Sequence, residues 1–192
     1  MSLNIKERGA LKTNRLSLAR RGVMALTALC AAAALALSGT ATANAAWPNP
    51  DVPAGEYDII ALDSGWELMS YAHDNEEWYD SSDKVFEVTN GRIPPDEEED
   101  YATSGGGIRN AADINAFITI YVAAAPAGGS ITIGSGSPSW TVDINNWDSN
   151  WVEANSHEHF EWTFSEPGDY KIVVTAENGL TFAYQTYLFT VS

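Results

Sequence analysis

The sequence predicts an all-β protein, an immunoglobulin-like antiparallel β-sandwich that is preceded by a signal peptide. Short runs of β-branched and aromatic residues recur from residue 56 to the end of the chain. Gly, Pro, Asn and Asp, which favour turns, stand between these runs. No stretch after residue 45 has a sustained helical period. About seven or eight short strands in one domain are typical of two packed antiparallel sheets.

Residues 1–45 have the layout of an export signal. Six of the ten Lys and Arg residues lie in this segment, ahead of an uncharged run at 23–37. Small residues follow, and the Ala-Asn-Ala sequence at 43–45 is a suitable cleavage site. The uncharged run is shorter than the roughly 20 apolar residues of a membrane span. We therefore expect residues 46–192 to form a single secreted domain without a membrane span.

Composition excludes several classes of function. The only cysteine, Cys30, lies within the predicted signal, so residues 46–192 have neither a disulfide framework nor a thiol nucleophile. The full chain has a formal net charge of −16. A strongly negative protein repels nucleic acid and anionic membranes, and we expect neither as a partner. An acidic surface attracts cations, although solvation is the simplest explanation of its charge.

The strands follow in order from the turn residues between them. Residues 56–74 predict a hairpin that turns at Asp63-Ser64-Gly65. Residues 92–107 contain two prolines, five consecutive acidic residues and three consecutive glycines, which predicts an acidic, Gly-rich loop. Further strands are predicted at 84–91, 114–124 and 129–134, and at 159–164, 169–176 and 181–192.

Two of the three histidines, His157 and His159, stand two residues apart next to a run of aromatic residues. Alternate side chains of a strand share a face, so both imidazoles point to one side. Phe160, Trp162 and Phe164 point to the other side, which we expect to face the core. The Cα atoms of the two histidines are then about 6 to 7 Å apart, close enough for both rings to reach one metal ion.

The third histidine, His73, ends the second strand of the predicted hairpin. Glu56, Asp58 and Asp74 are available nearby as oxygen ligands. One site with three histidines and a carboxylate or water would account for every histidine in the chain. Imidazole and carboxylate suit zinc, copper, nickel, iron or manganese. The alternative is that exposed histidines form hydrogen bonds only with neighbouring glutamates.

The stretch at 156–176 resembles the actinobacterial surface-anchored repeat domain, which also occurs in proteins described as having a choice-of-anchor M domain. The positions that carry the resemblance are His157, His159, Trp162, Phe164, Pro167, Gly168 and Tyr170. The segment at 56–74 is similar to a second part of that pattern, a His-x-Asp strand, a glycine turn and a strand that ends in histidine. The resemblance covers about half of residues 46–192, and the middle of the chain at 85–130 lacks the family's tryptophan and proline-rich segment.

The resemblance implies an extracellular, β-rich domain of the cell envelope, often encoded beside metal-type ABC transporter components. Glu56 stands where the family has its first histidine. The implied metal site therefore consists of His73, His157, His159 and Glu56. Its partners would be the metal ion and a cell-envelope or ABC-transporter component.

The predicted function is that of a non-enzymatic, secreted or cell-wall-associated domain that binds zinc or another divalent transition metal and is linked to metal uptake. One alternative is a surface adhesion or glycan-binding module, because exposed aromatic rings stack on sugars. The aromatic residues considered for that role are Trp66, Trp78, Tyr79, Trp140, Trp147 and Trp151. Another alternative is a zinc-dependent hydrolase or lyase, because three histidines and a water form an open catalytic site. Nothing else in the sequence supports catalysis, and no catalytic residue is predicted.

Overall fold

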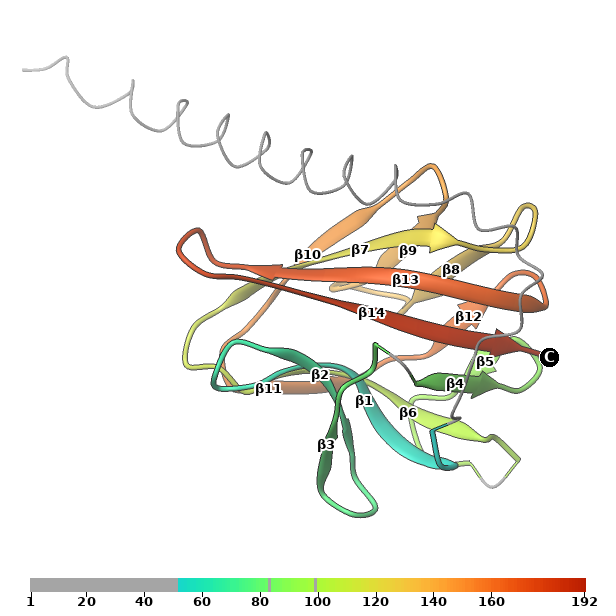
Figure 1. Ribbon diagram of the computed structural model, residues 1–192, viewed down its shortest axis with the longest axis horizontal. Helices are drawn as coiled ribbons and strands as arrows, with labels where there is room; N and C mark the ends of the chain where they lie inside the picture. Colours follow the sequence, from blue (N-terminus) through green and yellow to red (C-terminus); the bar gives the residue numbers. More distant parts are fainter. Residues whose placement is uncertain (1–51, 83, 99) are drawn as a thin grey trace, which may run out of the picture. The chain divides into compact units, whose positions relative to one another are not determined.

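Fourteen β-strands make up the regular structure of the described residues, which are 52–192 apart from Asp83 and Glu99 in a computed structural model (Figure 1). The predicted signal peptide at 1–45 lies outside these residues. No helix occurs among them, and so none that is long and apolar enough to span a membrane. The prediction of an all-β fold is confirmed.

The strands form three sheets, which we call the site sheet, the long sheet and the small sheet. The site sheet contains, in spatial order, β11 (Ser156–His159), β6 (Thr103–Asn110), β1 (Gly55–Leu62), β2 (Leu68–Ala72) and β3 (Glu77–Tyr79). The long sheet contains β10 (Asp148–Val152), β7 (Ala116–Ala124), β13 (Gly168–Glu177), β14 (Phe182–Val191) and β4 (Val85–Val88). The small sheet contains β5 (Arg92–Ile93), β12 (Trp162–Phe164), β8 (Ser130–Ile133) and β9 (Trp140–Asp143).

The predicted arrangement of two antiparallel sheets differs from the structure in two respects. There are three sheets, and two of the strand pairs are parallel, β1 with β6 and β4 with β14. Parallel partners are far apart in the sequence, so no local turn signals their pairing. The immunoglobulin-like relationship stays a prediction.

The three sheets share one hydrophobic core. Side-chain hydrogen bonds also connect the sheets. The hydroxyl of Tyr187 in the long sheet donates to the carbonyl of Met69 in the site sheet at 3.0 Å. The indole N–H of Trp162 in the small sheet donates to the carbonyl of Gly106 in the site sheet at 2.8 Å. Because both rings are fully buried, these bonds satisfy polar atoms that packing removes from water.

The histidine stretch forms two strands where the sequence predicts one. The chain leaves the site sheet after His159 and enters the small sheet at Trp162. The division into faces survives this break only in part. Trp162 and Phe164 are buried and His157 is exposed, as predicted, but Glu158, which alternation places on the same side as Trp162, is also exposed. The predicted hairpin at 56–74 is confirmed by the pairing of β1 with β2.

The loop predicted at 92–107 is wrong at both ends. It begins with β5, and its three glycines belong to β6. Glycine is depleted in strands because it lacks a side chain that packs on neighbours, so composition alone argues for a loop. Here β6 is an inner strand between β1 and β11, and those two neighbours supply the hydrogen bonds that hold it extended.

Candidate metal site

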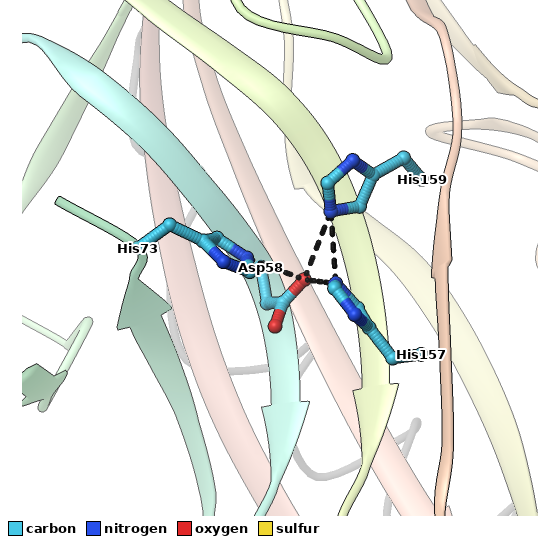
Figure 2. A group of neighbouring side chains, drawn as sticks. All are labelled: Asp58, His73, His157 and His159. Carbon is cyan, nitrogen blue, oxygen red and sulfur yellow. Dashed lines mark hydrogen bonds and ion pairs between the residues drawn. The ribbon is translucent and has the colours of Figure 1, made fainter. Parts of the chain in front are cut away.

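Four side chains of the site sheet and its margin converge on one point (Figure 2). Asp58 comes from β1, His73 follows the last residue of β2, and His157 and His159 come from β11. Each offers a ligand atom, and these four atoms all lie within 4.8 Å of one another. The structure thus brings together all three histidines of the predicted site, and the carboxylate among them is that of Asp58.

Strand register places these four residues side by side. In the parallel pair, Asp58 of β1 stands opposite Gly107 of β6. In the antiparallel pair on the other side of β6, His159 stands opposite the same glycine. Asp58 and His159 therefore lie two strands apart, about 9 to 10 Å between their backbones, with no side chain between them. The N–H of His73 donates to the carbonyl of Glu56 at 3.0 Å, which fixes the third ligand beside β1.

Gly107 makes room for the carboxylate. A Cβ atom at this position would collide with Oδ1 of Asp58 and would lie 2.9 Å from its Cα. The pairing of β1 with β6 also shifts register on both sides of Asp58. Such irregularities commonly change the direction in which a side chain points. The glycine and the irregular register together direct the carboxylate of Asp58 across β6 toward the histidines.

Asp58 is a buried carboxylate without hydrogen bonds. Its side chain is 0% exposed, and neither oxygen has a hydrogen-bond partner among the described residues. Its Oδ1 lies 2.7 Å from Nε2 of His157, 3.3 Å from that of His73 and 3.7 Å from that of His159. The shortest of these contacts has the length of a hydrogen bond, but Nε2 of His157 also lies 2.8 Å from Nε2 of His159 and can carry only one proton. A buried charge without hydrogen-bond donors is unfavourable, so a cation bound at Oδ1 would stabilise it.

The separations between ligand atoms fit a small metal ion. Tetrahedral zinc with bonds of about 2.0 to 2.1 Å requires ligand atoms about 3.3 to 3.4 Å apart. The three distances from Oδ1 of Asp58 span that value. The Nε2 atoms of His157 and His159 are closer, 2.8 Å apart, which is a hydrogen-bond distance. Without a metal, one of these two nitrogens carries the proton that joins them, and a bound ion would take its place.

Glu56 has a different position from the other predicted ligands. Its Oε1 lies 3.4 Å from Nδ1 of His159, on the side of the ring away from Oδ1 of Asp58. A carboxylate there favours the imidazole form with its proton on Nδ1, which leaves the lone pair of Nε2 facing the other ligands. Glu56 thus orients His159, and Asp58 occupies the position of the oxygen ligand.

The environment of His157 favours the neutral ring that a metal requires. Burial lowers the pKa of His157 below its ordinary value of 6.5, and the neighbouring rings of His159 and His73 act in the same direction. The carboxylate of Asp58 opposes this shift without reversing it. His157 is therefore largely neutral at pH 7, with its nitrogen available to an ion.

No family model matches this chain, and no curated protein sequence matches it. The site is therefore interpreted from its own geometry.

Two residues near the site were not identified from the sequence. Gly107 belongs to the run of three glycines that was assigned to a loop. Ile108, Arg109 and Asn110 directly after it do not alternate between apolar and polar residues, so they gave no strand signal. Glycine within a strand often marks a close approach by another group. Arg109 carries a charge beside Asp58, with Nη1 3.6 Å from Oδ2. Its role depends on a contact that local sequence does not encode.

Replacing Gly107 with alanine should disrupt both the strand and the site. The added methyl group competes with the carboxylate of Asp58 for the same space, and overpacking of this kind costs about 1 to 3 kcal/mol. Urea unfolding of wild-type and G107A chains measures the loss. Gly136 provides the matched control, because a Cβ there meets nothing within 4 Å. Its alanine variant should stay within about 0.5 kcal/mol of wild type, and equal stabilities of G107A and wild type would contradict the steric argument.

The stability of the metal-free chain should depend on pH through His157. Its pKa is lower in the folded than in the unfolded chain, so the unfolded chain takes up this proton more readily. The free energy of unfolding therefore does not depend on this group well above about pH 6.5. Below that value, it decreases as the pH falls. Thermal unfolding with a chelator present should show a smaller loss in His157→Gln than in wild type. Identical pH profiles would show that the environment does not lower the pKa of His157.

Proposed function

We propose that this chain is a secreted or cell-surface domain that binds one divalent transition-metal ion and takes part in metal uptake without catalysing a reaction. The observation that carries the proposal is the carboxylate of Asp58, which is fully buried, lacks hydrogen bonds and is faced by three imidazole nitrogens. A metal ion at that point would neutralise the carboxylate and bind the lone pairs of the rings.

The donor set supports zinc as the first metal to test. Three imidazole nitrogens and one carboxylate oxygen also suit copper, nickel, iron and manganese. Zinc prefers four ligands in structural sites, and this cluster offers four ligand atoms within 4.8 Å of one another. With Asp58 in the fourth position, no place remains for the water that a catalytic zinc would activate. This supports binding over the hydrolase or lyase alternative.

The exposure of the site on one side would allow a metal ion to exchange with the solvent. The side chain of His157 is 40% exposed, whereas that of Asp58 at the other end of their contact is fully buried. An ion would therefore enter past the imidazoles and reach the carboxylate last. The proposed export signal and the resemblance to surface-anchored repeat domains support an extracellular setting, with a cell-envelope or ABC-transporter component as partner.

The full-length chain, freed of metal by chelation, should take up about one zinc ion per molecule in calorimetry. The H157A/H159A double variant should lose this uptake, because half of the ligands are removed. Glu158→Ala is the matched control, since Glu158 lies between the two histidines on the same strand and is exposed. Uptake by wild type should also fall below about pH 6, where protons compete for imidazole nitrogens. Absence of uptake by wild type, or equal uptake by the double variant, would refute the proposal.

A second candidate function, glycan binding, is favoured by exposed aromatic rings on the long sheet. Trp147 and Trp151 are 54% and 60% exposed. They pack beside Tyr121 and Phe117 of β7, with ring centroids 5.9 and 5.2 Å apart. Trp140, in contrast, is fully buried and cannot contact a sugar.

If this second function holds, the chain should give signals on a glycan array that the W147A/W151A variant loses. The H157A/H159A variant should keep them, because its changes lie in a different sheet. An array without signals for wild type would remove this candidate and would leave the metal proposal unaffected.

A further inference from the structure

The two oxygens of Asp58 face different partners. Oδ1 lies 2.7 to 3.7 Å from the Nε2 atoms of the three histidines. Oδ2 lies 3.6 Å from Nη1 of Arg109 on β6. A carboxylate whose oxygens are both free can bind a metal through one or through both, whereas a carboxylate with a cation beside one oxygen tends to offer only the other.

Arg109 is held in place by aromatic rings. Its guanidinium carbon lies 4.6 Å from the ring centre of Tyr71 and 5.7 Å from that of Trp78. These two residues are cross-strand partners on β2 and β3, and their own rings are 5.2 Å apart. Guanidinium groups bind favourably to such aromatic faces. The contacts restrict the positions that the long arginine side chain can take near Asp58.

A positive charge beside a cation site carries an electrostatic cost. Arg109 and a divalent ion repel each other, and the repulsion is larger near a buried group than in water. Arg109 also stands directly opposite His157 in the pairing of β6 with β11, so it cannot be far from the ion. Arg109 therefore weakens the binding of any divalent ion, so a preference between ions has to come from its effect on Asp58.

We propose that Arg109 is a positioning residue that keeps Asp58 bound to the metal through Oδ1 alone, and thereby selects ions that accept four ligands, such as zinc and cobalt(II), over manganese(II). Manganese prefers more oxygen ligands and a higher coordination number. With the positive charge of Arg109 beside Oδ2, the site offers three nitrogens and one oxygen. This inference rests on the proposed metal-binding function and adds the coordination number and the class of ion.

Cobalt(II) provides the test, because its visible absorption is strong with four ligands and weaker with five or six. Wild type should give the strong four-ligand spectrum. In Arg109→Met, Oδ2 becomes free to bind, and the band intensity should fall. The preference for zinc over manganese, measured by competition, should narrow by about tenfold, which corresponds to about 1.4 kcal/mol. Arg109→Lys keeps the charge without the planar group and should restore part of the intensity.

Controls separate this inference from the proposed function and from damage to the fold. Arg92→Met is the matched control, because Arg92 pairs with Glu161 at 2.8 Å and Glu98 at 3.3 Å, none of which belongs to the site. If R109M does not fold, Trp78→Leu is the second variant, because Trp78 is partly exposed and its ring restricts the position of Arg109. The cobalt(II) band intensity of this variant should also fall. If wild type takes up metal but the spectra of the Arg109→Met and Trp78→Leu variants are unchanged, only the proposed role of Arg109 is overturned. No uptake by wild type would overturn the proposed function as well.

Discussion

The burial of the Asp58 carboxylate is the constraint on which the site sheet depends. Taking a carboxylate out of water costs several kcal/mol, and Arg109 lies beside only one of its two oxygens, 3.6 Å from Oδ2. The surrounding strands nevertheless leave space for this group, with a glycine opposite it on β6 and shifted register on both sides. The cost of burying this carboxylate supports the proposed metal site.

Local patterns were sufficient to predict the histidine pair. The period of two in a strand puts His157 and His159 on one side whatever the rest of the sheet does, and the aromatic residues after them mark the opposite direction as the core. The break between β11 and β12 left this conclusion intact, because His157 and His159 both lie on β11 while the buried rings of Trp162 and Phe164 lie on β12. His73 was predicted with equal success for a local reason, since it follows directly on a hairpin strand whose turn is encoded by Asp and Gly.

The identity of the oxygen ligand could not be predicted in the same way. Glu56 and Asp58 stand two residues apart on β1, so alternation places both on one face and does not choose between them. The choice depends on β6, which pairs with β1 from a distant part of the sequence and presents Gly107 opposite Asp58. The glycine run suggested a loop because composition reports average behaviour, whereas β6 is extended through its two neighbours. A single sequence gives little information about which distant segments pair.

The site also connects strands that are otherwise weakly joined. β11 lies at the end of the site sheet, and only four residue pairs join it to β6. Two of the four candidate ligands come from this short strand, one from β1 and one from the residue after β2. An ion held by all four would connect β11 to the hairpin across β6, so part of its binding free energy would appear as stability of that strand. Without the ion, only its pairing with β6 would hold β11 in the site sheet. Metal occupancy and the order of this strand are therefore expected to rise and fall together, which couples the chemistry of the site to the edge of the sheet that carries it.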